Sequence, residues 1–359
     1  MREGFLGHAT SGLFAEPRLR STPDPRHGRV VRAFACPSCR QLVVFENSRC
    51  LRCGTALGVD PETRTMVAAE DWAPCANAAV AACNWVVPGE RAGERCRSCA
   101  LTRTRPADGD VDALAAFAQV ERAKRRLVFQ LLELEVPLAG LAFDLLSSRE
   151  GPVVTGHAGG LVTIDLAESD DAHRAAVRAS LGEPYRTVLG HLRHEIGHFA
   201  WMVLVEGTPA IERFRALFGD EREDYAAALE RHYGAGGTRS WWNQHVTAYA
   251  AAHPWEDWAE TFAHYLHLRD TLETAAAYGV VVAGPAVATD RPFDGTLAAT
   301  PVLDPGDEPF DALLAEWLPL TYALNALNRS MGAGDLYPFV LNAPVVRKLA
   351  FVHDLLRNH

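Results

Sequence analysis

Apolar residues recur at spacings of three and four between residues 184 and 205, which predicts an amphipathic helix with one buried face. The apolar positions are Val188, Leu189, Leu192, Ile196, Phe199, Met202 and Val203. Pro184 suits the first helical position, and Glu183 suits the positive end of the helix dipole. Gly197 lies inside this segment, where glycine costs about 1 kcal/mol relative to alanine, so we expect close packing to explain it.

A second helix is predicted to begin at Pro254, because proline is favoured in the first helical turn. Its apolar stripe consists of Trp255, Trp258, Phe262 and Tyr265 or Leu266. Glu256, Glu260 and His264 follow one another at intervals of four residues, in a polar stripe beside the aromatic one. This stripe is either a solvated acidic face near a helix N-terminus or a set of functional side chains.

The remaining pattern predicts an α+β fold. Helices are expected at residues 111–135, 310–327 and 345–356. Short strands are expected at residues 141–146, 153–155 and 161–166, with a turn at Gly156, Gly159 and Gly160. Residues 206–250 are helical and irregular by turns, with a glycine-rich break at 234–237, and residues 280–308 form a long glycine- and proline-rich loop. Residues 102–111 contain Pro106 and Gly109 and predict a linker between two domains.

All eight cysteines lie between residues 36 and 99. The first four, Cys36, Cys39, Cys50 and Cys53, form two Cys-x-x-Cys pairs on either side of a strand-like segment, which is typical of a zinc ribbon. The other four, Cys75, Cys83, Cys96 and Cys99, form a second and less regular Cys₄ set. Disulfides are the alternative, but Cys-x-x-Cys spacing suits two thiolates that bind one metal.

Length and charge place these features in a protein of more than one unit. The chain has 359 residues, of which 48% are hydrophobic, so about two domains are expected. Its net charge is −10, but residues 1–106 contain 15 Arg and 10 acidic residues and carry +5. The arginines are scattered, which argues against a nucleic-acid partner. Binding of a protein partner, or structural support of the rest of the chain, is the role that we expect for the ribbon. No apolar run suits a signal peptide or a membrane span, so we expect a soluble cytoplasmic protein with reduced cysteines.

Chemistry is most concentrated in the pentapeptide His194-Glu195-Ile196-Gly197-His198. Residues four apart lie on the same face of a helix, so one Zn²⁺ can bind both imidazoles, and Glu195 can take a proton from a water on that metal. A catalytic zinc needs a third protein ligand, and both Glu256 and Glu260 could reach it. His264 is a weaker candidate for the zinc site. His191 could reach the metal too, but a fourth protein ligand would leave no open position for water.

The two segments together resemble the gluzincin metallopeptidases, especially the peptidase domain of anthrax lethal factor. The resemblance rests on His194-Glu-x-x-His198 and on Glu256-x-x-Ala259-Glu260-x-Phe262. It implies that Glu256 is the third zinc ligand, that Glu260 supports the ligands from behind, and that Tyr249 helps to stabilise the oxyanion. Most of residues 30–358 is also similar to a bacterial family of zinc-binding metallopeptidases with an N-terminal zinc ribbon.

These observations predict an arm at residues 1–29, a zinc ribbon with one or two Cys₄ sites at 30–104, and a mainly helical, zincin-like metallopeptidase domain with a small sheet at 105–359. The predicted function is hydrolysis of peptides or proteins by one catalytic Zn²⁺, with Glu195 as general base. Residues 161–166 are either an edge strand that pairs with the substrate backbone or part of an ordinary hairpin. Two other functions stay open: an inactive adaptor that binds peptide or protein, and a nucleic-acid-binding regulator.

Overall fold

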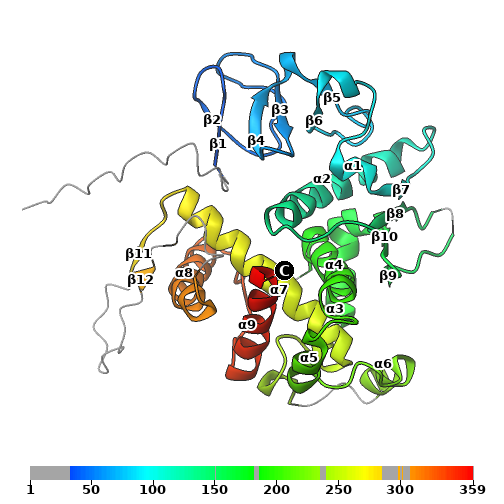
Figure 1. Ribbon diagram of the computed structural model, residues 1–359, viewed down its shortest axis with the longest axis vertical. Helices are drawn as coiled ribbons and strands as arrows, with labels where there is room; N and C mark the ends of the chain where they lie inside the picture. Colours follow the sequence, from blue (N-terminus) through cyan, green and yellow to red (C-terminus); the bar gives the residue numbers. More distant parts are fainter. Residues whose placement is uncertain are drawn as a thin grey trace, which may run out of the picture.

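The computed structural model describes residues 33–149, 151–181, 186–234, 240–284, 298, 299, 301 and 308–358. The expected arm at 1–29, Pro184, residues 235–237 of the glycine-rich break and most of the loop at 280–308 lie outside the described residues. A small cysteine-rich β region lies at one end of the molecule, and a larger, mainly helical region lies at the other (Figure 1). The predicted α+β organisation is therefore confirmed.

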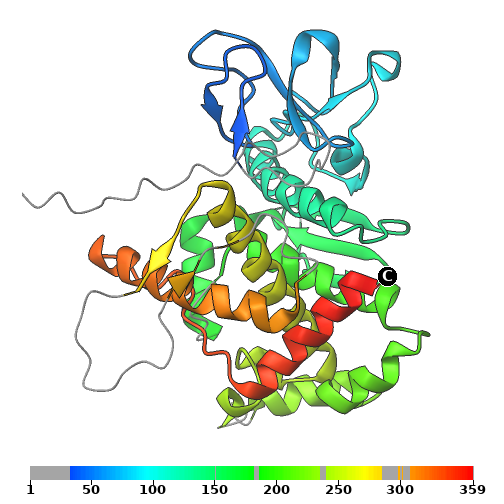
Figure 2. The same ribbon diagram turned by 60° about the vertical axis from the view of Figure 1, so that its left-hand side comes forward.

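The cysteine-rich region is built from three short antiparallel hairpins. Its strands are β1 (Phe34–Ala35) with β2 (Leu42–Val43), β3 (Leu57–Asp60) with β4 (Thr65–Ala68), and β5 (Ala73–Pro74) with β6 (Val86–Val87). The short helix α1 (Arg97–Ala100) follows. Such short strands bury little apolar surface, so the region packs on helix α2 (Val111–Glu133), which lies directly beneath it in Figure 2. Phe129 of α2 contacts the rings of Phe34, Phe45 and Trp85 there.

One four-stranded sheet joins the two regions. Its strands are β7 (Thr102–Thr104), β8 (Ala142–Leu146), β9 (Gly156–Ala158) and β10 (Leu161–Asp165), in the order β7-β8-β10-β9. β7 and β10 are parallel to β8, and β9 is antiparallel to β10.

Two expectations in this segment are wrong, and the structure decides a third that was open between two alternatives. Residues 102–104 belong to the sheet and not to a linker, because β7 forms ladder hydrogen bonds with β8. The strand expected at 153–155 begins only at Gly156. β10 is not an edge strand, since both of its sides are paired; the edges are β7 and β9, and of the two alternatives for residues 161–166 the hairpin holds. Gly159 and Gly160 form its turn at φ values of +54° and +86°, which glycine adopts readily.

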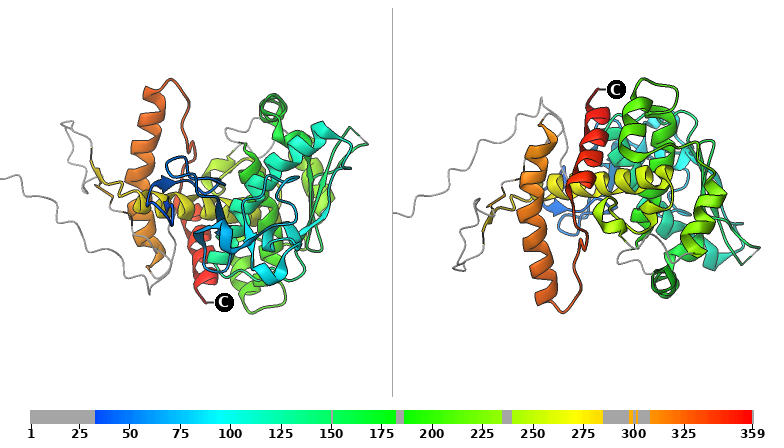
Figure 3. Two further views of the ribbon diagram at one scale, coloured as in Figure 1. Left: turned by 90° about the horizontal axis from the view of Figure 1, so that it is seen from above. Right: turned by 90° about the horizontal axis from the view of Figure 1, so that it is seen from below.

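The larger region is a set of helices around two that cross at its centre, α4 (Val188–Leu204) and α7 (Pro254–Ala277). The others are α3 (Asp171–Leu181), α5 (Ala210–Phe218), α6 (Tyr225–Gly234), α8 (Phe310–Ser330) and α9 (Ala343–Asn358). Short 3₁₀ helices lie at Ala69–Asp71, Gly89–Arg91, Leu166–Ser169, Trp241–Asn243 and Tyr249–Ala251, and β11 (Val282–Ala283) pairs with β12 (Ala298–Ala299). Figure 3 shows α8 on the side of α7 opposite to the sheet.

The two central helices begin where their caps place them. α7 begins at Pro254 as predicted, and the His253 side chain accepts a hydrogen bond from the Trp255 amide. α4 begins at Val188, one turn later than predicted, because Thr187 is extended and its hydroxyl accepts from the Gly190 amide. Among the described helices, none combines the length and apolar character that crossing a bilayer requires.

Candidate metal centres

The crossing of α4 and α7 brings three potential metal ligands together. His194 and His198 of α4 and Glu256 of α7 are buried, and one ligand atom from each lies within 4.8 Å of the others. Glu256 Oε2 is 3.1 Å from His194 Nε2 and 3.5 Å from His198 Nε2. The same oxygen accepts no hydrogen bond among the described residues. Two imidazoles and a carboxylate that face one another in a buried space suit a divalent cation, and zinc in particular.

Gly197 allows the two helices to approach this closely. A Cβ atom at this position would lie 2.7 Å from Ala259 Cα and 2.9 Å from the Ala259 carbonyl oxygen. The Trp258 indole donates a hydrogen bond to the Gly197 carbonyl at 2.7 Å, which ties α7 to α4 beside the ligands. The expected close packing at this glycine is therefore confirmed.

Glu260 is not one of the three potential ligands; it contacts His194 at Nδ1, the ring nitrogen that does not face Glu256. His194 Nδ1 and Glu260 Oε1 are 2.6 Å apart, and the Thr247 hydroxyl donates to Glu260 Oε2 at 2.7 Å. A carboxylate at Nδ1 favours the tautomer that leaves Nε2 free for a metal. The structure thus separates the two candidates that the spacing left open: Glu256 faces both Nε2 atoms, whereas Glu260 holds one imidazole.

Glu195 is buried next to the three ligands, and its two carboxylate oxygens differ. Oε1 is 3.3 Å from His191 Nε2, whereas Oε2 has no hydrogen-bond partner in the described part of the chain. Burial acts to raise the pKa of Glu195, but His191 and the neighbouring imidazoles outweigh it and lower the pKa below its ordinary value. This carboxylate is therefore ionised and can accept a proton.

Neither of the other histidines near the motif joins the metal group. His191 faces Glu195 on one side and Glu168 on the other. The burial of Glu168 raises its pKa, but the neighbouring His191 and the hydrogen-bonded Arg186 outweigh this effect and lower the pKa to about 2. His264 Nδ1 is 2.7 Å from the Tyr337 hydroxyl, and burial lowers the pKa of His264 to about 4.

Two tyrosines lie beside the ligands, and only one was expected. The ring of Tyr249 is 5.8 Å from the ring of His194. The hydroxyl of Tyr225, at the start of α6, donates to Glu256 Oε1 at 2.6 Å. Burial first, and then the charge of Glu256, raise the pKa of both phenols, so both stay protonated and can donate. No spacing rule pointed to Tyr225, because it lies 31 residues before its partner in a separate helix.

Two aromatic rings, of Trp255 and His157, lie beside the potential ligand His198 on the side that faces the sheet. The Trp255 ring lies 4.0 Å from the His198 ring, and His157 of β9 lies 6.2 Å from His198. Burial is the main cause that lowers the pKa of His157 to about 4, so its imidazole is neutral. The edge strand β9 therefore borders the candidate metal centre, whereas residues 161–166, the candidate edge strand of the sequence analysis, form the inner strand β10.

The cysteines form the two predicted clusters. Cys36 with Cys53, and Cys39 with Cys50, have sulfurs 3.6 Å apart, and Cys83 and Cys96 have sulfurs 3.7 Å apart. All eight cysteines are free thiols. A disulfide needs about 2.05 Å between its sulfurs, whereas four sulfurs at about 2.3 Å from a tetrahedral Zn²⁺ lie about 3.8 Å apart. Both clusters therefore fit zinc.

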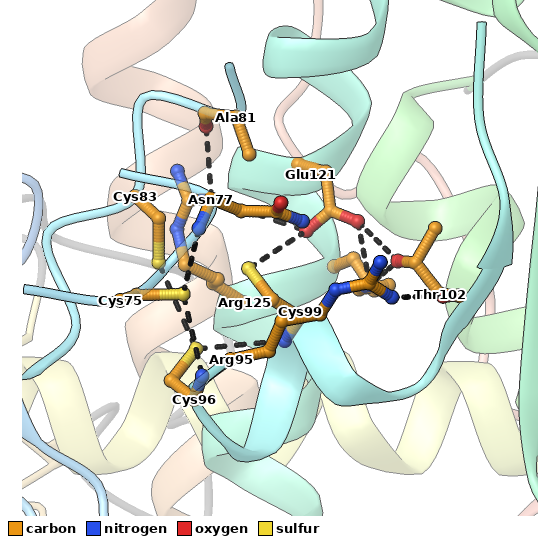
Figure 4. Close-up of polar contacts among 11 residues, drawn as sticks. Cys75, Asn77, Ala81, Cys83, Arg95, Cys96, Cys99, Thr102, Glu121 and Arg125 are labelled. Atoms are coloured by element: carbon orange, nitrogen blue, oxygen red, sulfur yellow. Dashed lines mark hydrogen bonds and ion pairs between the residues drawn. The ribbon is translucent and has the colours of Figure 1, made fainter. Parts of the chain in front are cut away.

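The second cluster is anchored to α2 (Figure 4). The Cys75 sulfur accepts hydrogen bonds from the amides of Asn77 and Cys96 at 3.4 and 3.3 Å. The buried Arg125 of α2 donates to the Ala81 and Ala82 carbonyls at 3.1 and 3.0 Å, in the loop that precedes Cys83. The neighbouring Glu121 is 3.9 Å from the Cys99 sulfur and 2.6 Å from Lys124 Nζ. The cysteine-rich region and the helical region thus share one set of buried polar contacts.

Comparison with known proteins agrees with this organisation. The sequence model of the family described as "Putative zinc-binding metallo-peptidase" matches residues 113–355. The chain belongs to this family of zinc-binding metallo-peptidases. A second model, described as "zinc-ribbon domain", matches residues 33–110. The resemblance to a family of zinc-binding metallopeptidases with an N-terminal zinc ribbon is therefore confirmed, and the cysteine-rich region is the zinc ribbon of this family member.

Relatives of this metallo-peptidase family member include uncharacterised proteins of Mycobacterium tuberculosis, from strains H37Rv and CDC 1551, and of Mycobacterium bovis. Each is 47% identical to the chain, over 91% of the chain and 95% of the relative. No solved structure matches the chain significantly.

Proposed function

We propose that this protein is a zinc-dependent peptidase of the gluzincin type, with His194, His198 and Glu256 as the ligands of a catalytic zinc. When bound there, zinc lowers the pKa of a water molecule to about 7 and polarises a substrate carbonyl. Glu195 takes up a proton through Oε2 and passes it to the leaving amine. The phenols of Tyr249 and Tyr225 are hydrogen-bond donors for the oxyanion. Glu260 and Thr247 keep His194 in the orientation that binds metal.

The observation that carries this proposal is Oε2 of Glu195, which has no hydrogen-bond partner among the residues that the structure describes and lies next to three buried potential ligand atoms. Burying a carboxylate oxygen without a partner is costly, and a site that only holds a metal has no use for it. An inactive adaptor that merely binds peptide would tolerate glutamine or alanine at residue 195. The buried carboxylate therefore favours the enzyme over that adaptor.

We propose that the zinc ribbon holds two structural zinc ions and supports the peptidase domain. Phe129 of α2 packs against the Phe45 ring of the ribbon, and Arg125 of α2 donates a hydrogen bond to the Ala81 carbonyl of the ribbon. The same ribbon could still carry a protein partner, whereas its scattered arginines argue against nucleic acid. Eight reduced cysteines suit a reducing compartment, so we propose the cytoplasm.

The proposal is tested by measuring zinc content and peptide cleavage in three proteins. Wild type should contain three zinc ions per chain, one for each cluster, and should cleave members of a peptide library. Glu195→Gln should keep all three ions and lose at least about 100-fold in turnover. His194→Ala should lose one ion and all turnover. Equal cleavage by wild type and Glu195→Gln would refute the mechanism.

A further inference from the structure

His191 lies one helical turn before Glu195 on α4, and both side chains are nearly enclosed. Its Nε2 is 3.3 Å from Glu195 Oε1, with the side chains 14% and 6% exposed. An imidazole N–H at this distance can donate a hydrogen bond to a carboxylate oxygen. His191 is therefore directed at the carboxylate of the proposed base and not at the metal ligands.

Two further side chains lie beside the other ring nitrogen of His191, which is within ion-pair range of a carboxylate but makes no hydrogen bond in the described part of the chain. Its Nδ1 lies 3.7 Å from Glu168 Oε1, an ion-pair distance, and Arg186 donates to that same oxygen at 2.7 Å. Glu168 belongs to the 3₁₀ helix that follows β10, so the arrangement connects the sheet to α4. Along the row Arg186, Glu168, His191 and Glu195, groups that can carry positive charge alternate with carboxylates. Each buried charge thus has a neighbour of opposite sign.

This arrangement makes the two oxygens of Glu195 unequal. His191 lies within ion-pair distance of Oε1, and Oε2 has no hydrogen-bond partner in the described ranges and lies beside the proposed metal ligands. A carboxylate held by one oxygen loses the rotational freedom that would otherwise let either oxygen turn away from the reacting atoms. A histidine that only filled space would not need a carboxylate on each side.

We propose that His191, supported by Glu168 and Arg186, is a positioning residue that holds Glu195 so that Oε2 faces the metal centre. This inference rests on the proposed function, because it assigns Glu195 the role of base. It assigns the row Arg186, Glu168 and His191 to the reaction machinery, although none of the three binds the metal.

The test compares two substitutions that differ in one hydrogen bond. His191→Gln can place an amide N–H where Nε2 lies, whereas His191→Leu cannot donate. We expect His191→Leu to keep its zinc and to lose about 10- to 100-fold in kcat with KM changed less than about threefold, because outer partners of a site typically contribute this much. His191→Gln should recover most of the loss. His353→Leu removes a buried histidine on α9 that pairs with Tyr265, and it controls for burial alone.

A second readout does not depend on turnover. In protein with Co²⁺ in the catalytic site, the visible absorption spectrum reports the surroundings of the metal. His191→Leu should change this spectrum in the same direction as Glu195→Gln, and adding it to Glu195→Gln should change nothing more. His353→Leu should leave the spectrum as in wild type. If His191→Leu keeps the wild-type spectrum and kcat, or if His191→Gln is as impaired as His191→Leu, the positioning role is wrong. Full turnover by Glu195→Gln would instead show that the proposed function has failed.

Discussion

Gly197→Ala should push apart the two helices that carry the metal ligands. The added Cβ would lie 2.7 Å from Ala259 Cα, whereas ordinary contact begins at 3.4 Å, so α4 and α7 must separate locally by about 0.7 Å. The obstructing atoms are backbone, so no side chain can rotate to relieve the clash. Zinc sites tolerate only about 0.2 Å in ligand distance. Glu256 would therefore move out of reach of the metal that we propose His194 and His198 bind.

The expected loss of stability follows from two opposing effects. Alanine is favoured over glycine inside a helix by about 1 kcal/mol, and overpacking in a rigid core costs about 3 kcal/mol. The net loss is about 2 kcal/mol, which lowers Tm by about 4 to 8 °C in a domain of this size. The affinity for the catalytic zinc should fall at least about tenfold, because the ligands no longer converge.

Thermal unfolding of the zinc-loaded protein and titration with a competing chelator measure the two quantities. Gly234→Ala is the matched control, since Gly234 also lies in a helix but a Cβ atom added there would have nothing within 4 Å. It should leave zinc affinity unchanged and raise stability by no more than about 1 kcal/mol. If Gly197→Ala binds zinc as tightly as the control and unfolds at the same temperature, the close approach of the helices does not set the metal geometry.

Two further substitutions test the supports of the metal centres. Thr247→Val removes the hydroxyl that donates to Glu260 at 2.7 Å, and it should weaken catalytic zinc binding about tenfold in the same chelator titration; unchanged affinity would mean that Glu260 needs no such support. Arg125→Met removes two hydrogen bonds to carbonyls of the ribbon and should lower the free energy of unfolding by about 3 kcal/mol in urea. Arg126→Met, which loses an exposed ion pair with Glu46, should cost less than about 1 kcal/mol, and equal losses in the two variants would contradict the anchoring role of Arg125.

Local patterns were enough to predict the elements that carry the chemistry. Residues four apart share a helix face whatever surrounds the helix, so His194 and His198 could be paired from their spacing. The Cys-x-x-Cys pairs predicted the zinc ribbon for a similar reason, because a two-residue turn directs both thiolates to one side. The start of α7 followed from Pro254, whose conformation and missing amide suit a first helical turn.

Contacts between distant segments depended on how the chain folds. The spacing alone left Glu256 and Glu260 equivalent as ligands. Where α4 and α7 cross, the two carboxylates take different positions, and Glu260 contacts His194 although 66 residues separate them in the sequence. No local pattern indicates the contact of Tyr225 with Glu256 or that of His191 with Glu168, and the choice between edge strand and hairpin for residues 161–166 depended on the whole sheet. Periodicity reports which face of an element is apolar, but it does not report which element packs on that face. That choice is made by burial and steric fit over the whole molecule, as the contact between Gly197 and Ala259 illustrates.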